Sequence, residues 1–472
     1  MSHIDCDICI VGAGSGGLSV AAGAAQMGAR VVLIEKGEMG GDCLNSGCVP
    51  SKALLAAAKQ AHAMTKGAEM GITPVTPEID FAAVKEHVAR SIATIAPVDS
   101  QERFEGFGIT VIREHARFTS PHEMQAGDTT IKARRFVLAT GSRPLVPPID
   151  GIEDTPYLTN ETIFGLRERP RHLLVIGGGP IGIEMAQAHR RLGSEVTVIE
   201  GAKALGKDDP ELAEQLLGRL RAEGIRIEEG AKVTAVSGHE GAITVETEKG
   251  RFEGSHLLMA VGRQVVTDGL GLDVAHVKHD RHGITVGEDL RSETNRRVYA
   301  VGDAAGGLMF THVAGYHAGV IIRSMLFALP SKARTAHIPW ATYTDPGLAQ
   351  VGLTEAQARE KHGDALRVIR MAYDENDRAI AEGRTLGTLK LMAVKGRPVG
   401  ATILGASADE LIGVWAIAIA SGTKLSKIAG AVLPYPTLGE INKRAAGNYF
   451  SASLFDNEWV KTAVRAVQRW IP

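Results

Sequence analysis

The sequence predicts an α/β protein with several domains, and three observations support this fold class. At usual domain sizes, 472 residues form about three domains. An apolar strand, a glycine-rich turn, a helix and a second strand occur in this order twice, around residues 8–35 and 173–200. From about residue 340 the pattern changes to alternating strands and helices without a third glycine turn. We therefore expect two similar α/β domains followed by one α+β domain.

Composition and charge narrow the class of protein further. With 44% hydrophobic and 22% charged residues, the chain is neither disordered, nor collagenous, nor a small disulfide scaffold. A formal net charge of −2 provides no long-range attraction to nucleic acid or anionic lipid. The first residues lack a signal-peptide pattern, and the longest apolar stretch, 411–420, is about half a membrane helix. We expect a cytoplasmic protein with no nucleic-acid partner and no membrane partner.

Each repeated segment has the features of a dinucleotide-binding βαβ unit. The first glycine of such a turn allows a tight bend, the second admits a pyrophosphate, and the third lets helix pack on strand. An acidic residue lies 18 positions after the third glycine in both copies. The residues concerned are Gly12, Gly14, Gly17 and Glu35 in the first copy, and Gly177, Gly179, Gly182 and Glu200 in the second. Two Rossmann-like sites predict two cofactors that exchange electrons. The alternative is two glycine turns in an unrelated α/β fold.

Two of the four cysteines, Cys43 and Cys48, follow the first acidic residue. Residues 50–64 have a helical pattern, which places Cys48 at or just before a helix N-terminus, where the helix dipole favours a thiolate. Lys52 adds positive charge one turn on, and the spacing lets the two sulfurs bond. The alternative is a pair of buried thiols. We predict no metal site, because no histidine lies nearby and two ligands are too few.

The other two cysteines, Cys6 and Cys9, have a C-x-x-C spacing but lie inside the first predicted strand. Residues three apart on a strand point to opposite faces. We therefore expect both to be core residues without a redox role.

The segment from Gly40 to Lys52, between two dinucleotide folds, resembles the pyridine nucleotide-disulfide oxidoreductases. This family includes dihydrolipoamide dehydrogenases, glutathione reductases and mercuric reductases, and the likeness covers almost the whole chain. Residues 139–144 resemble the crossover to the nicotinamide domain, and residues 261–263 resemble the return from it. Residues 299–303 resemble the second FAD motif, and residues 343–354 resemble the start of the dimerisation domain.

The resemblance implies a domain order and two cofactors, FAD and NAD. It implies an FAD domain at residues 1–147 and 273–340, an NAD(P) domain at 148–272 and a dimerisation domain at 341–472 of a homodimer. Besides the glycines and acids of the two turns, the implied cofactor-binding residues are Lys52, Thr140, Gly141, Gly262, Asp303 and His312.

The resemblance also implies how the cysteines work. Cys48 would be the charge-transfer thiol against the flavin and Cys43 the interchange thiol that attacks substrate, the two forming a redox-active disulfide. Lys52 would lie near flavin N5, paired with Glu184. Because an acid at position 200 accepts hydrogen bonds from a ribose and repels a 2′-phosphate, we expect NADH rather than NADPH, with nearby Lys203 as the counter-argument.

Two positions depart from the family pattern. Tyr435 stands where these enzymes have the histidine of a catalytic His–Glu pair, while Glu440 keeps the place of the acid. A tyrosine with a pKa near 10 is a poor base at neutral pH, which puts efficient dithiol turnover in doubt. Asp42, where threonine is usual, would raise the pKa of the Cys43 thiol. His312 could replace the histidine, but a satisfied position at a helix start is the simpler interpretation.

The resulting functional prediction is an FAD-dependent NADH:disulfide oxidoreductase, closest to dihydrolipoamide dehydrogenase, with a lipoyl group or another disulfide as substrate. Tyr435 and Glu440 of the other subunit would complete each active site. One alternative is a mercuric-ion reductase, although no cysteine follows Cys48 to deliver metal. The other is a redox-sensing flavoprotein with slow turnover.

Overall fold

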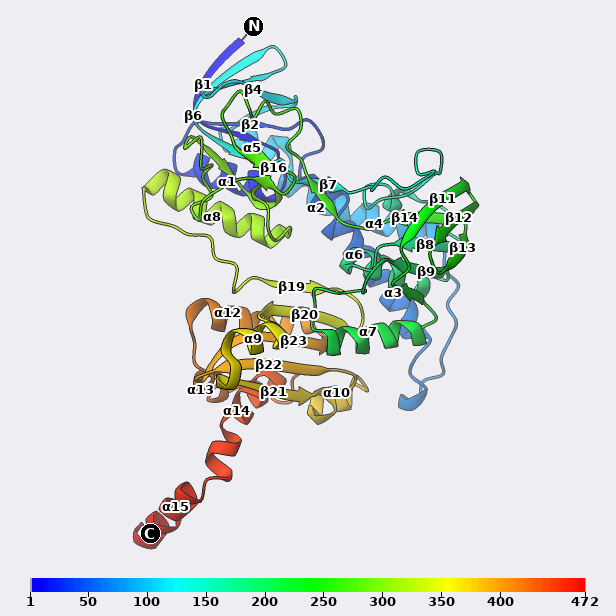
Figure 1. Cartoon of the computed structure of the whole chain (residues 1–472), viewed down its shortest axis with the longest axis vertical. Coiled ribbons are helices and arrows are strands. Elements are labelled where there is room, and N and C mark those ends of the chain that lie inside the picture. The colour runs from blue at the N-terminus through cyan, green and yellow to red at the C-terminus, as the bar shows by residue number, and fades with distance from the viewer. Residues whose placement is uncertain (1, 472) are drawn as a thin grey trace. The chain divides into compact units, whose positions relative to one another are not determined.

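The computed structural model describes residues 2–471, except the side chains of 452 and 453. The chain divides into two compact units (Figure 1). The first contains Met1–Gly201 and Ile225–Arg334, and the second contains Ala202–Gly224 and Thr335–Pro472. The segment 202–224 groups with residues 335–472 in the second unit.

A seven-stranded sheet forms the centre of the first unit. Strands β3, β2, β1, β6 and β18 are parallel neighbours in that order, and β5 and β4 continue the sheet beyond β6 in antiparallel fashion. Their bounds are β1 Ser2–Val11, β2 Val31–Ile34, β3 Thr110–Ile112, β4 Ala116–Ser120, β5 Glu123–Ala126, β6 Thr129–Leu138 and β18 Val298–Ala300. The carboxyl ends of β1 and β2 lead into the first glycine turn and Glu35, as the sequence predicts.

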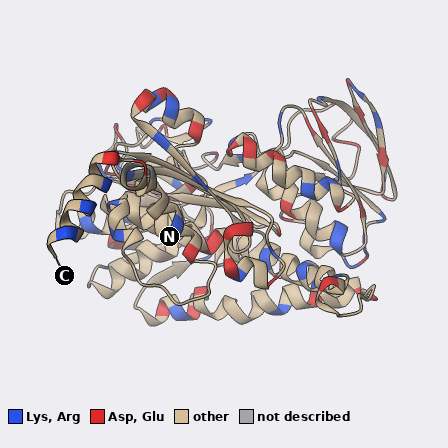
Figure 2. Ribbon diagram, turned by 90° about the horizontal axis from the view of Figure 1, so that it is seen from below, with Lys and Arg blue, Asp and Glu red and all other residues tan. Residues whose placement is uncertain are grey.

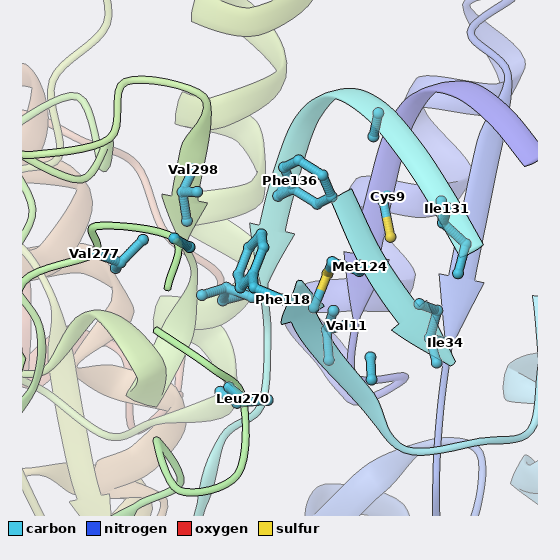
Figure 3. Close-up of a cluster of buried hydrophobic side chains, with 14 of the residues drawn as sticks. Cys9, Val11, Ile34, Phe118, Met124, Ile131, Phe136, Leu270, Val277 and Val298 are labelled. Atoms are coloured by element: carbon cyan, nitrogen blue, oxygen red, sulfur yellow. The ribbon is translucent and has the colours of Figure 1, made fainter. Parts of the chain in front are cut away.

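The core of this sheet fixes β1 from both faces. Ile8 and Ile10 pack into one buried cluster, while Cys9 and Val11 pack into another, which follows the alternation of a strand. In the second cluster, Phe118 and Phe136 meet edge to face with ring centroids 5.0 Å apart (Figure 3). Both faces of β1 are therefore buried up to Val11, the last residue before the glycine turn.

Both cysteines of β1 are core residues, as predicted. Cys6 and Cys9 are buried in the same hydrophobic cluster, so the expectation that they point to opposite faces of the strand is not met. Burial raises the pKa of the Cys6 thiol to about 12, and burial also raises the pKa of Cys9 well above its usual value. Neither thiol ionises near neutral pH, so neither has the reactivity of a redox cysteine.

A second, four-stranded parallel sheet carries the second glycine turn. Its strand order is β10 (Arg226–Glu229), β9 (Glu195–Glu200), β8 (His172–Ile176) and β14 (His256–Met259). The repeated order of elements is confirmed, since α1 (Ser15–Gln26) joins β1 to β2 and α6 (Pro180–Arg191) joins β8 to β9. A three-stranded antiparallel sheet follows, made of β11 Val233–His239, β12 Ala242–Thr247 and β13 Gly250–Gly254.

The remaining elements of the first unit surround the two glycine turns. Helix α1 packs with α8 (Thr311–Phe327), and α3 (Cys48–Met64) packs with both α4 (Phe81–Ile95) and α6. Strands β7 and β15 pair antiparallel where the chain crosses between the two sheets. The other bounds are α2 Gly41–Asn45, α5 Gln101–Gly106, β7 Ser142–Pro144, β15 Arg263–Val265, β16 His279–Asp280 and β17 Gly283–Ile284.

The second unit contains a five-stranded sheet with neighbours β19 (Pro339–Thr342), β20 (Gly347–Gly352), β23 (Arg397–Gly405), β22 (Thr388–Val394) and β21 (Leu366–Ala372). All its strand pairs are antiparallel. Its helices are α7 Pro210–Ala222, α9 Glu355–His362, α10 Asp377–Ala381, α11 Ala408–Leu411, α12 Gly413–Ser421, α13 Leu425–Ala429, α14 Glu440–Phe455 and α15 Glu458–Trp470. Helix α11 ends just before α12 begins at Gly413, a residue with low helix propensity.

None of the helices within residues 2–471 combines the length and the apolar character that crossing a bilayer requires.

Candidate functional site

The first glycine turn has the geometry of a pyrophosphate cradle. Gly12 has φ +105°, and a Cβ there would lie 2.3 Å from the Ala139 carbonyl oxygen. A Cβ on Gly17 would lie 1.8 Å from the Gly12 oxygen, so only glycine fits either position. A Cβ on Gly14 would come no closer to its surroundings than 3.9 Å, so the turn is open where a ligand would approach. Within the described residues, α1 has no side-chain cap and no acid in its first turn, which leaves its N–H groups for an anion.

The acid that closes this βαβ unit is held at the turn. Glu35 Oε2 accepts a hydrogen bond from the Ala13 N–H at 2.6 Å, and Oε1 accepts one from the Gly37 N–H at 2.6 Å. The carboxylate therefore lies beside the cradle, as binding of an adenosine ribose requires.

The second turn repeats the geometry. A Cβ on Gly177 would lie 2.3 Å from the Ala260 oxygen, and one on Gly182 would lie 2.0 Å from the Gly177 oxygen. Gly179 again opens onto free space, and Glu200 Oε2 accepts a hydrogen bond from the Gly178 N–H at 2.8 Å. Both turns thus fit a dinucleotide.

The cysteine segment packs directly on the first turn. The Gly40 N–H donates to the Ala13 carbonyl at 2.9 Å, and a Cβ on Gly41 would lie 2.7 Å from Gly14 Cα. Gly40 and Gly41 have φ values of +86° and +61°, which suit glycine. The segment that carries Cys43 is therefore placed against the cradle by close backbone contact.

Cys48 is the first residue of α3, which confirms its predicted place at a helix N-terminus. Both cysteines are free thiols, the two-electron reduced form of a disulfide. A hydrogen bond from the Cys43 thiol lowers the pKa of Cys48 to about 6, assisted by Thr311 and by the charge of Lys52. The same hydrogen bond and burial raise the pKa of Cys43 well above its usual value. At neutral pH, Cys48 is the thiolate and Cys43 keeps the proton.

Thr311, which the sequence analysis missed, is the first residue of α8, and its hydroxyl lies 3.2 Å from Cys48 Sγ. Its neighbour His312 lies at the helix start, as expected, with its ring stacked on Phe310 at 5.3 Å between centroids. Because 263 positions separate Thr311 from Cys48, no local pattern announces their contact.

Lys52 and Glu184 form the expected ion pair, with 2.9 Å between Lys52 Nζ and Glu184 Oε2. Glu184 lies on α6 with 6% of its side chain exposed, and Lys52 lies on α3 with 37% exposed. The pair therefore links the cysteine helix to the helix of the second dinucleotide unit.

The crossover strands bring Asp303 into a polar cluster. Asp303 Oδ2 accepts from the Ser142 hydroxyl at 2.5 Å, and Arg263 Nε donates to the same hydroxyl at 2.7 Å. Burial raises the pKa of Asp303. The turn preceding it is held by the Gly302 N–H, which donates to His317 Nδ1 at 3.3 Å. The Thr140 hydroxyl donates to the Val266 carbonyl at 2.7 Å. Gly141 and Gly262, the two predicted glycines of the crossover, have φ values of +66° and +142°.

Asp42 acts differently from the sequence expectation. Its carboxylate lies 3.3 Å from Arg263 Nη2 and accepts a hydrogen bond from Asn160 Nδ2 at 2.9 Å. The groups that raise the pKa of Cys43 are Cys48 and burial, whereas the charge of Asp42 raises the pKa of Cys48. The expectation that Asp42 raises the pKa of Cys43 is therefore wrong, because its negative charge acts on the Cys48 sulfur, which is the one that ionises.

Tyr435 and Glu440 both lie in the second unit. Tyr435 is 69% exposed, and its hydroxyl donates to Asp377 Oδ2 at 2.7 Å, which raises the pKa of the phenol. Arg444 Nη2 lies 3.4 Å from the same oxygen. Glu440 Oε2 is buried without a hydrogen-bond partner among the described residues. Sequence analysis missed Asp377, since nothing local marks a residue 58 positions before Tyr435.

Within residues 2–471, no cluster of three or more His, Cys, Asp and Glu side chains could hold a metal ion.

Two dinucleotide cradles, with a thiolate–thiol pair packed on one of them, define an oxidoreductase that moves electron pairs between a nucleotide cofactor and sulfur. Comparison with known families gives the same class. The family described as pyridine nucleotide-disulphide oxidoreductase matches residues 6–318, and its dimerisation domain matches 338–446. The chain belongs to the pyridine nucleotide-disulphide oxidoreductase family, whose members use FAD and NAD(P)H.

Individual relatives carry different activities in their names. A mercuric reductase of Streptomyces lividans is 33% identical over 463 residues, covering 95% of this chain and 97% of the relative. A dihydrolipoyl dehydrogenase of Geobacillus stearothermophilus is 33% identical over 455 residues, covering 94% and 96%. Among solved structures, the Cu(II) complex of the HOCl-induced flavoprotein disulfide reductase RclA from Escherichia coli has a TM-score of 0.84 at 28% identity, over 93% of this chain and 99% of that one.

Proposed function

We propose that the chain is a homodimeric NADH:disulfide oxidoreductase that works through a Cys43–Cys48 disulfide. The observation that carries this proposal is the position of Cys48, which is the first residue of α3 and lies 3.2 Å from the Thr311 hydroxyl, just after a segment that packs on the first glycine turn. When bound, FAD and the nicotinamide supply two-electron transfer between NADH and the cysteine pair.

The proposed cofactor sites follow the two cradles. FAD would be held by the first cradle and the crossover cluster, in a domain of residues 1–147 and 273–340, and NADH by the second cradle, within 148–272. The proposed FAD residues are Gly12, Gly14, Gly17, Glu35, Lys52, Thr140, Gly141, Gly262, Asp303 and His312, and the proposed NADH residues are Gly177, Gly179, Gly182 and Glu200. Residues 341–472 would form the dimerisation domain. We also propose a cytoplasmic location.

The sulfur chemistry follows from the unequal pKa values. Once Cys43 has lost its proton, its thiolate attacks one sulfur of a substrate disulfide, and one substrate thiolate leaves. Cys48 then attacks the Cys43 sulfur of the mixed disulfide, which forms the Cys43–Cys48 bond and releases the second thiolate. The two leaving thiolates take up two protons, one of which comes from Cys43. The low pKa of Cys48 makes it a ready nucleophile and, in reverse, a ready leaving group.

Tyr435 and Glu440 of the partner subunit would supply the other proton in this proposal. The hydrogen bond to Asp377 keeps the Tyr435 phenol protonated at neutral pH, so it can donate a hydrogen bond but is a weak acid and a weak base. We therefore expect slower dithiol turnover than a histidine would support.

The first test is NADH-linked reduction of lipoamide, and the reverse reaction, by purified FAD-loaded protein. Turnover of about ten per second or more would make it a dihydrolipoamide dehydrogenase despite Tyr435. Negligible turnover, with a flavin that NADH still reduces within seconds, would point to another acceptor. Flavin reduction that takes hours would instead favour a redox sensor.

A second candidate acceptor is thiol-bound Hg(II), which Tyr435 and the similarity to mercuric reductases favour. Against it, no cysteine follows Cys48 in the sequence. If the enzyme does not reduce lipoamide, an assay of NADH oxidation with thiol-bound Hg(II) as the acceptor tests this candidate.

The preference for NADH is proposed from Glu200. Its carboxylate lies at the second cradle, where it repels a 2′-phosphate. We expect kcat/KM for NADH to exceed that for NADPH, and Glu200→Ser to narrow the ratio of the two values at least about tenfold, which corresponds to about 1.4 kcal/mol of lost like-charge repulsion. A wild-type enzyme faster with NADPH would contradict the assignment, and Glu195→Gln on the same strand is the control.

A further inference from the structure

We propose that α15 binds the surface of a membrane containing anionic lipid, lying along the surface without crossing it. Figure 1 shows α15 extending away from the sheet of its own unit. The proposal depends on the surface of this helix and is independent of the redox chemistry.

One side of α15 is apolar and uncovered. At 3.6 residues per turn, Trp459, Val460, Val464, Val467 and Trp470 fall on one face together with two alanines. No residue of the helix is buried, and Trp459 and Trp470 are 86% and 85% exposed. Nothing in the described part of the chain buries this face, so it is accessible to a surface outside the chain.

The opposite side of α15 is basic. It carries Lys461, Arg465 and Arg469 against a single acid, Glu458, for a net charge of +2. Figure 2 shows these basic positions recurring along the helix beside the C mark. Glu458 lies 2.7 Å from Lys461 Nζ and 3.7 Å from Arg465 Nη2, but exposed pairs of this kind are weak and yield to other anions.

This combination matches a lipid interface better than a second copy of the chain. Tryptophan rings at both ends of an apolar face suit the headgroup region, and flanking cations suit lipid phosphates. The helix has 13 residues and is about 20 Å long, too short to span a bilayer. A second copy of the chain could also cover the tryptophans. Its formal net charge is only −2, so it matches the basic side of α15 less well than a surface of anionic lipid does.

The sequence expectation of no membrane partner concerned the whole-chain charge and spanning segments. The local charge of α15 has the opposite sign to the chain, and a surface helix needs no spanning length. The proposal therefore revises that expectation for this one helix.

The test is co-flotation of FAD-loaded full-length protein with phosphatidylcholine vesicles, with and without phosphatidylglycerol. We expect binding to the anionic vesicles at low salt and release at high salt. Trp459→Ala/Trp470→Ala should reduce binding at least about tenfold, because each ring buries a large apolar area. Lys461→Gln/Arg465→Gln/Arg469→Gln should reduce it on the order of 100-fold at low salt.

Thr462→Ala/Gln468→Ala is the matched control, since it changes uncharged polar side chains of the same helix and should leave binding unchanged. Retained flavin reduction by NADH shows that each variant is folded. Failure of the wild-type protein to float with anionic vesicles overturns the proposal, as does binding that is indifferent to the two tryptophans. If the tryptophan variant instead dissociates the oligomer in light scattering while the wild type ignores vesicles, a second copy covers the face and the proposal is wrong.

Discussion

At the scale of single residues, the chemistry of the site depends on which sulfur holds a proton. Cys48 has a helix N-terminus, Thr311 and Lys52 around it, while Cys43 has its partner sulfur and a partly buried setting. The same residue type therefore has two different functions within one short segment. This asymmetry makes the order of thiol exchange directional.

The asymmetry predicts a pH profile for alkylation of the reduced protein. The rate at Cys48 should rise as pH increases through about 6, because the thiolate is the reactive form. Cys43→Ala should move the midpoint upward, since it removes the hydrogen bond that lowers the pKa most. Mass spectrometry of iodoacetamide-treated protein measures both, with buried Cys6 and Cys9 as internal unreactive thiols.

Asp42→Asn provides a control of opposite sign. The carboxylate raises the pKa of Cys48, so its removal should shift the alkylation midpoint downward. An upward shift, or none, would mean that Asp42 acts through the position of Arg263 and not through its charge on the sulfur.

At the scale of elements, the site is held by contacts between helices. The Lys52–Glu184 pair joins α3 to α6, and Glu184 is almost completely buried. Removing one partner of such a pair leaves a charge without compensation.

Lys52→Met should therefore lower the free energy of unfolding of the first unit by about 2 kcal/mol, less than a wholly buried pair because Lys52 is partly exposed. The double variant Lys52→Met/Glu184→Leu should recover part of this loss. Urea denaturation measures both, and Arg251→Gln, which breaks an exposed pair with Glu253, should change little. Equal losses in the single and double variants would contradict the explanation.

A second contact between elements, in the second unit, predicts acid sensitivity. Lys390 on β22 is 3% exposed and contacts Asp209 at 2.9 Å and Glu211 at 2.8 Å, which ties α7 to the sheet. Hydrogen bonds from Arg370 and Lys390 lower the pKa of Glu211 to about 2 from its usual value of 4.5.

Because the folded pKa of Glu211 is depressed, its stabilising contribution is complete above about pH 4.5 and is lost as pH falls toward about 2. We expect the urea midpoint of the second unit to fall over this range, and Glu211→Gln to flatten the dependence. Circular dichroism at stepped pH measures it. An unchanged slope in the variant would show that other carboxylates cause the loss.

At the scale of the whole molecule, the proposed active site needs two subunits. The cysteines belong to the first unit, and Tyr435 and Glu440 belong to the second. If each site combines cysteines of one subunit with Tyr435 and Glu440 of the other, two defective variants can complement each other.

A heterodimer of Cys43→Ser with Tyr435→Phe/Glu440→Gln should therefore regain about half the wild-type acceptor turnover, since one of its two sites is intact. Each parent homodimer should remain inactive. Differently tagged subunits, purified as the mixed dimer, allow the measurement. A heterodimer without activity would place all the catalytic residues of a site in one subunit.

Much of the fold and part of the site could be predicted from local sequence. The repeated glycine turns, the helix that begins at Cys48, and the buried strand position of Cys6 and Cys9 all follow from patterns within about 30 residues. The antiparallel order of the five-stranded sheet could not, since tertiary packing decides it.

The sequence by itself determined the two nucleotide cradles and the reactive cysteine pair, because glycine conformation, helix dipoles and strand periodicity act between near neighbours. Only the tertiary structure decided which side chains tune that pair. Thr311 contacts Cys48, Arg263 lies beside the Asp42 carboxylate, and Asp377 accepts the hydrogen bond of the Tyr435 hydroxyl. These contacts join residues far apart in the chain, and electrostatic effects on pKa depend on distance in space, which no spacing in the sequence encodes.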